Sequence, residues 1–267
     1  MRGLFPGGHT VQVQMPGAVL RRSALIGIPW PMRPLVVRVR DVEQAQTAAR
    51  DGADLVLYEG ADVSLAADIV LSAHANGARV ALTLPGSGAI AQTGADAVWA
   101  RTLDSETKRR FPETRELIPS NSPTLLEEVA AAADRASFDR LLATVGVVEV
   151  PRPALAPLGL LAPGGIVVDP TSLDLVKARK RQTPLREGKT AILIVQNRRA
   201  VVTFRAGHQS LLWVANLDPS MEWRFVPEGV SRPLDLLGGA LDGDAIRIRP
   251  GDFSLIVQLP GRDPSRL

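Results

Sequence analysis

Short apolar runs alternate with amphipathic stretches along residues 35–181 of the chain. The apolar runs are rich in valine, leucine and isoleucine and are bounded by glycine, proline or charged residues, which is typical of buried strands. We expect strands at residues 35–40, 54–58, 79–84, 97–100, 116–119, 145–150 and 165–168.

The amphipathic stretches between these runs predict helices at residues 42–50, 63–75, 122–132 and 169–180. Ser122-Pro123 and Asp169-Pro170 each combine an N-cap residue with a proline at the first helical position. Strands that alternate with helices over short links are parallel, and strands that are apolar on both sides need cover on both faces. The pattern therefore predicts a compact (β/α) barrel-like domain over residues 35–183.

The pattern changes near residues 183–189, where proline, glycine and charge cluster. Beyond this point only strands and turns are expected, with Asn197-Arg198-Arg199 as a hairpin turn. The expected strands lie at residues 191–196, 200–204, 210–216, 222–226, 245–249 and 253–258. We predict an antiparallel β-sandwich over residues 190–260, with Trp213 in its core. The fold class is thus α/β, a barrel-like domain followed by a sandwich.

Residues 1–34 precede the first predicted barrel strand. Val11, Val13, Val19 and Leu20 flank Pro16-Gly17, as in a hairpin. This leader is interpreted as a swapped arm, a barrel plug or a hairpin that closes the bottom of the barrel.

The composition is that of an ordinary globular protein, with 45% hydrophobic and 22% charged residues. Cysteine is absent, which excludes a disulfide scaffold and a thiolate zinc site. No apolar run approaches the roughly 20 residues of a transmembrane helix, and the first residues lack the apolar core of a signal peptide. We expect a cytoplasmic protein without a membrane partner, and leave secretion open.

The net charge of +3 is a small excess of 31 basic over 28 acidic residues. The densest basic stretch, residues 177–181, ends a predicted helix, where cations complement the helix dipole. No nucleic-acid partner is therefore expected. His9, His74 and His208 match no metal-ligand spacing, so neither a metal nor another cofactor is expected, and His74 is interpreted as structural. The scarcity of lysine relative to arginine and the 21 prolines are typical of a GC-rich or thermophilic source.

Several segments resemble the α-amylase family, glycoside hydrolase family 13. Residues 169–173 (Asp-Pro-Thr-Ser-Leu) and 185–188 (Leu-Arg-Glu-Gly) are similar to the last barrel helix of that family and the segment that leaves it. Residues 201–205 with 211–217, and later 232–237 and 249–253, resemble strands of its C-terminal sandwich, and residues 73–80 resemble one of its helix–strand units. These segments cover about half of the chain. The resemblance implies a carbohydrate-active protein.

The chain departs from the family pattern where the family carries its chemistry. Residues 85–88 (Pro-Gly-Ser-Gly) stand where the family has an aspartate and an Asn-His pair, and Arg101 stands in the place of the nucleophile. The predicted α/β part is also shorter than the roughly 200 residues of a complete eight-unit barrel. No catalytic residue of the family can be carried over to this chain.

Glu59 and Glu149 are the candidate catalytic pair, because each directly follows an apolar run. In a parallel β/α domain, functional side chains gather at the carboxyl ends of the strands, and glycoside hydrolysis uses two carboxylates in different roles. The alternative is that each is a rim carboxylate paired with an arginine such as Arg101 or Arg152.

Other residues near the strand ends are candidates for substrate binding: Asp41, Tyr58, Trp99, Arg101 and Asp104. Tyr58, Trp99 and Trp30 are expected to form a stacking platform for sugar rings. Asp41 and Asp169 have the alternative role of N-caps.

Three function classes stay open from the sequence. The first is hydrolysis of a glycosidic bond in an oligo- or polysaccharide, and the second is a non-catalytic relative that binds a glycan or a protein. The third is a phosphate- or nucleotide-binding enzyme that uses the glycine-rich loop at residues 86–91.

Overall fold

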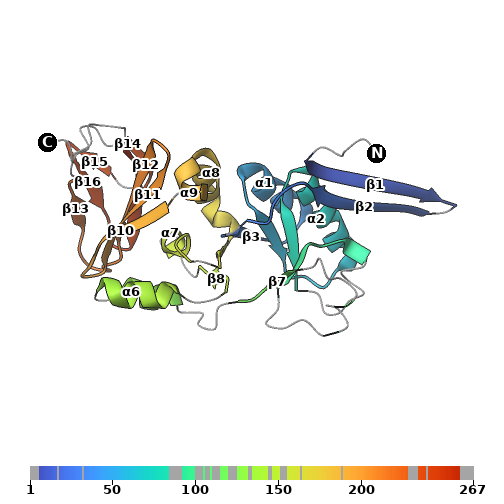
Figure 1. Ribbon diagram of the computed structural model, residues 1–267, viewed down its shortest axis with the longest axis horizontal. Coiled ribbons are helices and arrows are strands. Elements are labelled where there is room, and N and C mark those ends of the chain that lie inside the picture. The colour runs from blue at the N-terminus through green and yellow to red at the C-terminus, as the bar shows by residue number, and fades with distance from the viewer. Residues whose placement is uncertain are drawn as a thin grey trace. The chain divides into compact units, whose positions relative to one another are not determined.

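The computed structural model describes most of the chain in two compact units (Figure 1). It describes residues 6–16, 18–31, 33–83, 92–99, 105, 109, 115–119, 125–131, 134–143, 146–150, 155–162, 164–187, 189–227, 234–238 and 240–258. The first unit comprises Met1–Asn121, Val145–Glu149 and Pro163–Val176, and the second comprises Ser122–Thr144, Val150–Ala162 and Lys177–Leu267. Because the two units interleave along the chain, the predicted boundary at residues 183–190 stays a prediction.

Seven parallel strands form the sheet of the first unit, in the order β7-β6-β5-β4-β3-β9-β8. Their bounds are β3 Leu35–Val39, β4 Leu55–Tyr58, β5 Arg79–Leu82, β6 Ala97–Trp99, β7 Arg115–Leu117, β8 Val148–Glu149 and β9 Ile166–Val168. A parallel bridge between Pro119 and Val147 joins the two edges of this order, so the sheet curls into a barrel. The prediction of a barrel-like α/β domain is confirmed.

The barrel encloses a core to which β3 to β7, β9 and the residue just before β8 contribute. The inward residues are apolar and buried: Val36, Leu55, Leu57, Ala81, Ala97, Leu117, Val147 and Val167. Side chains of a strand alternate between its two faces, so the residue two positions after each of these also points inward. This alternation decides which side chains reach the mouth of the barrel.

Two helices of the first unit follow the predicted pattern. Helix α1 (Val42–Asp51) begins after Asp41, whose carboxylate accepts from the backbone N–H of Gln44, and it ends at Gly52, which has a left-handed φ of 111°. Helix α2 (Val63–Ala75) begins after Asp62, whose carboxylate caps the N–H groups of Ser64 and Leu65. Next to β9, η2 (Pro170–Ser172) leads into α8 (Leu173–Arg181).

The leader forms an antiparallel hairpin of β1 (Gly7–Met15) and β2 (Ala18–Ile26). The hairpin packs on α2, where the Ser23 hydroxyl lies 2.8 Å from Nδ1 of the buried His74. Whether the leader acts as a swapped arm, a plug or a closing hairpin stays a prediction. Trp30, which belongs to the same leader, packs on the barrel core, and the guanidinium groups of Arg79 and Arg115, the first residues of β5 and β7, lie over its ring.

The second unit contains two antiparallel sheets, ordered β10-β11-β12-β17-β14 and β13-β16-β15. The strands are β10 Lys189–Gln196, β11 Arg199–Ala206, β12 Gln209–Asn216, β13 Trp223–Phe225, β14 Leu234–Gly238, β15 Ala240–Asp242, β16 Ala245–Ile248 and β17 Asp252–Gln258. Asn197 and Arg198 both have positive φ, which fits the two-residue turn between β10 and β11. The core between the sheets includes Val214, Ile246 and Ile256, as predicted for a sandwich.

Short helices of the second unit were only partly predicted. Helix α5 (Leu125–Ala131) matches the expected helix, whereas α6 (Arg135–Leu142), α7 (Ala156–Gly159) and α9 (Thr183–Glu187) were not predicted. Asp134 caps α6 through the N–H of Ser137, a signal that is present in the sequence. Helix α9 lies where the sequence suggested only a linker. Within the described ranges no helix has the length and apolar character needed to cross a membrane.

Candidate functional site at the mouth of the barrel

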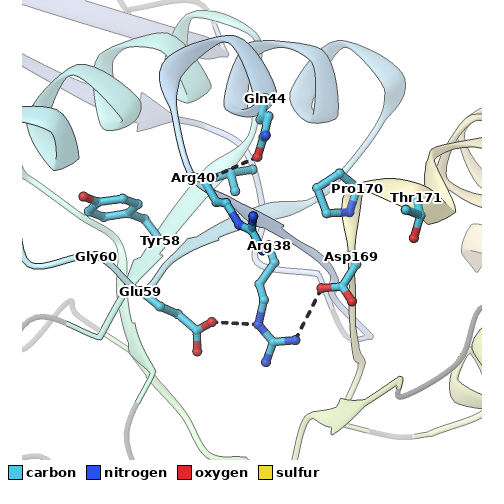
Figure 2. A pocket seen from close by; sticks show the side chains of 10 residues that line it. Arg38, Arg40, Gln44, Tyr58, Glu59, Gly60, Asp169, Pro170 and Thr171 are labelled. Carbon is cyan, nitrogen blue, oxygen red and sulfur yellow. Dashed lines mark hydrogen bonds and ion pairs between the residues drawn. The ribbon is translucent and has the colours of Figure 1, made fainter.

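Arg38 joins carboxylates from three other strand ends at the mouth of the barrel. Its Nε lies 2.7 Å from Oε2 of Glu59, one Nη lies 2.9 Å from Oε2 of Glu149, and the other lies 3.6 Å from Oδ1 of Asp169. Figure 2 shows the Arg38 side chain descending between Glu59 and Asp169. We call these four residues the Arg38 cluster.

The alternation of side chains explains why these residues meet. Arg38 stands two positions after the core residue Val36, and the three acidic residues stand two positions after Leu57, Val147 and Val167. The strands β4, β3, β9 and β8 are consecutive in the sheet. The guanidinium on β3 therefore reaches Glu59 on one neighbour, Asp169 on the other, and Glu149 one strand further.

Arg38 is held firmly in its charged form. Burial alone would lower the pKa of its guanidinium, but the hydrogen bonds to Glu149 and Glu59 outweigh burial and raise the pKa above its ordinary value. The fork of N–H donors on arginine suits this arrangement, because different nitrogens can serve different carboxylates. The two glutamates are thereby separated by the width of one guanidinium group.

A pocket of about 670 Å³ adjoins the cluster. Its lining comes from the ends of β3, β4 and β9, from α1 and from η2: Arg38, Val39, Arg40, Gln44, Tyr58, Glu59, Gly60, Asp169, Pro170 and Thr171. Figure 2 shows Tyr58 and Pro170 on opposite sides of this lining. The pocket offers carboxylate acceptors, guanidinium donors and an amide within a small volume, which suits a ligand with many hydroxyl groups.

The structure brings Glu59 and Glu149 together, as the sequence predicted. The arginine between them is Arg38, which was not predicted, whereas Arg101 and Arg152 lie outside the described residues, as does Asp104. The glycine-rich loop at residues 86–91 also lies outside them. An arginine inside an otherwise apolar strand is the feature of the sequence that could have identified Arg38.

The two predicted N-caps differ. Asp41 caps α1, so its carboxylate is occupied by the N–H of Gln44, and it is not among the described residues that line the pocket. Its role in substrate binding stays a prediction. Asp169 occupies the N-cap position of η2, but its side chain makes no capping hydrogen bond and pairs with Arg38 instead.

The predicted aromatic platform is not assembled. Trp30 lies at the amino ends of the strands, opposite to the mouth, because Arg79 and Arg115 hold it there. Trp99 packs against the barrel core, and among the described residues only Tyr58 of the three lines the pocket. The roles of Tyr58 and Trp99 in binding sugar stay predictions.

His74 has the structural role that the sequence suggested. The buried ring lies 2.8 Å from the Ser23 hydroxyl through Nδ1 and 2.8 Å from Asp96 Oδ2 through Nε2. Asp96 also accepts from Arg79 and from the backbone N–H of Val80, so it ties α2, β5 and β6 together at the start of β6. The described residues contain no group of three or more side chains suited to hold a metal ion.

Gly60 positions the Tyr58 ring, which leads to a testable prediction. A Cβ atom at residue 60 would overlap the phenol ring of Tyr58, so we expect Gly60→Ala to displace the ring from its buried position. Tyr58 is the single tyrosine of the chain, so the tyrosine fine structure of the ultraviolet absorption spectrum reports on it alone. An unchanged tyrosine band in a folded Gly60→Ala variant would contradict this packing.

Comparison with known proteins gives a likeness of fold. No protein-family model matches the sequence, and no curated protein matches it. Among solved structures, an α-amylase from Lactobacillus plantarum has a TM-score of 0.53 at 10% identity, over 85% of this chain and 99% of that one. An α-amylase from Geobacillus thermoleovorans, complexed with acarbose, has a TM-score of 0.53 at 10% identity, over 85% and 98%.

A third enzyme extends this likeness beyond the amylases. The cyclic α-maltosyl-(1→6)-maltose hydrolase from Arthrobacter globiformis matches with a TM-score of 0.52 at 10% identity, over 88% of this chain and 94% of the enzyme. The fold of this chain therefore resembles that of the α-amylase family over most of its length, as the sequence resemblance implied.

Proposed function

We propose that this protein binds carbohydrate in the pocket beside the Arg38 cluster, and that it does so without hydrolysing it. The observation that carries the proposal is that Glu59 and Glu149 share one guanidinium next to a polar pocket at the carboxyl ends of the strands. The fold likeness to proteins described as amylases and a maltose-type hydrolase supports carbohydrate as the ligand class.

The symmetry of the two glutamates favours binding over hydrolysis. A two-carboxylate hydrolase needs one group as proton donor and the other as nucleophile or base, and it distinguishes them by different environments. Here the side chains of Glu59 and Glu149 are 43% and 42% exposed and accept from the same arginine. They differ in that Glu59 lines the pocket and Glu149 is not among the described residues that line it, so only one of the two carboxylates is placed to contact a ligand there.

Glycoside hydrolysis by Glu59 and Glu149 is the second candidate. It is favoured by one observation, which is that carboxylates from separate strands converge at the mouth of a barrel of this fold. Ligand binding that displaced Arg38 from one glutamate would create the asymmetry that hydrolysis needs.

The test combines binding and turnover on the same protein. Isothermal titration with α- and β-glucan oligosaccharides, and assays with aryl glycosides, would be made on the wild type, Glu59→Gln and Glu149→Gln. We expect binding without turnover in the wild type. The affinity should be at least about tenfold weaker in Glu59→Gln, because Glu59 lines the pocket and a charge-assisted hydrogen bond contributes about 1.5–3 kcal/mol. Glu149→Gln should weaken binding less, because Glu149 acts on the pocket through Arg38.

One control variant and two contrary outcomes complete the test. Asp139→Asn removes an exposed carboxylate that pairs only with Arg135 among the described contacts, and it should bind as the wild type does. Turnover that is lost in both glutamine variants would establish the second candidate instead. A wild type that binds no oligosaccharide of the panel would overturn the proposed function.

A further inference from the structure

The β1–β2 hairpin is supported along only part of its length. Its two strands form a sheet of their own that joins no other sheet among the described strands. Near its ends, Ser23 bonds to His74, and Gly8 lies against the backbone of the same residue on α2. Figure 1 shows the rest of the hairpin projecting beyond α2. Because a lone two-stranded hairpin is marginally stable in water, we expect contact with a partner to stabilise the projecting part.

One face of β1 presents an apolar row to solvent. Val11, Val13 and Met15 are 63%, 47% and 49% exposed, and they share a face because side chains alternate along a strand. A contiguous apolar row of this kind often marks an interaction surface, whereas apolar residues scattered singly over a surface do not.

The free edge of β1 lacks the usual protection against strand pairing. Natural edge strands are guarded by lysine or other charges, by proline or by bulges. From Gly8 to Met15 the strand has no arginine, lysine, acidic residue or proline, and its register with β2 is continuous. The exposed arginines of the hairpin, Arg21 and Arg22, are both on β2. The edge of β1 can therefore pair with another strand, whereas the arginines disfavour such pairing at the edge of β2.

We propose that β1 pairs with β1 of a second copy of this chain, antiparallel and about a twofold axis. The product is a four-stranded sheet in the order β2-β1-β1-β2, in which Val11, Val13 and Met15 of both copies share one face. An antiparallel pair of identical strands is self-complementary, so the contact closes on itself as a dimer.

The distribution of charge favours a second copy as the occupant of this edge. The arginines of the two copies would stand three strand spacings apart, about 14 Å, which exceeds the screening length of about 8 Å at physiological salt. No like charges face each other across the β1–β1 contact. An acidic partner would be drawn to β2 instead, where Arg21 and Arg22 lie.

Sedimentation equilibrium of the whole chain, from low micromolar to near-millimolar concentration, tests the proposal. We expect a monomer–dimer equilibrium in which Gln12→Lys weakens the dimer by about tenfold, because it places like charges in the shared sheet. The control Ala24→Lys adds the same charge to an exposed position of β2 and should leave the dimer unchanged.

Three results would overturn the dimer. They are a monomer at every concentration, a dimer that both lysine variants weaken equally, and binding to phosphatidylserine vesicles by a chain that stays monomeric. Circular dichroism of both variants shows whether each is folded. Because no described residue of the hairpin lines the pocket, failure of the dimer leaves the proposed carbohydrate site untouched, and the reverse also holds.

Discussion

Asp96→Ala is expected to lower the free energy of unfolding by about 3–5 kcal/mol, since removing one member of a buried, hydrogen-bonded charge network has a cost of that order. Asp96 accepts from Nε2 of His74 at 2.8 Å, from Arg79 at 3.3 Å and from the N–H of Val80 at 2.8 Å. The His74 side chain is 1% exposed and that of Asp96 is 14% exposed, so water replaces the lost acceptor only in part. Urea denaturation followed by circular dichroism measures the loss.

The matched control for Asp96 is Asp139→Ala. Asp139 also pairs with an arginine, but both partners of that pair are exposed, so its loss should change stability by at most about 1 kcal/mol. Asp96→Asn keeps the shape of the side chain and one acceptor oxygen, and it should lie between the two. An Asp96→Ala variant that loses less than about 1 kcal/mol would show that the network does not hold the barrel and the hairpin together.

Arg38→Met is expected to abolish carbohydrate binding and to lower the free energy of unfolding by about 2 kcal/mol. The variant removes the donor of two short hydrogen bonds and leaves three carboxylates without their common cation. The stability effect is kept small because the carboxylates are partly exposed and water screens their repulsion. Titration calorimetry measures the binding, and urea denaturation measures the stability.

Two further variants serve as comparisons for Arg38→Met. Arg38→Lys keeps the charge but lacks the fork of donors, so it should recover part of the stability and little of the binding. Arg40→Met removes an exposed arginine that lines the same pocket and forms no ion pair with a carboxylate among the described residues, so its stability should match the wild type. Wild-type binding and stability in Arg38→Met would contradict the account of the site.

The barrel could be predicted because its strands depend on local pattern. Apolar runs that are buried on both faces, such as residues 35–40 and 54–58, are recognisable without knowledge of their partners. The convergence of Glu59 and Glu149 followed from the rule that carboxyl ends of parallel strands meet at one edge. Both predictions rest on properties of single segments.

Arg38 was missed because its role depends on strand order. Within residues 35–40 it was interpreted as part of a strand, although inward alternation from Val36 places it beside the mouth. Its partners became evident only once β3 was seen to lie between β4 and β9. Trp30 was placed wrongly for a similar reason, because its position depends on Arg79 and Arg115, which are remote in sequence.

A double-mutant cycle between Arg38→Met and Glu149→Gln tests the central claim most directly. The claim is that one arginine binds carboxylates from separate strands at the mouth of the barrel. The cycle measures the free energies of unfolding of the wild type, both single variants and the double variant. We predict a coupling energy of about 1 kcal/mol or more, whereas effects that add to within about 0.3 kcal/mol would contradict the contact.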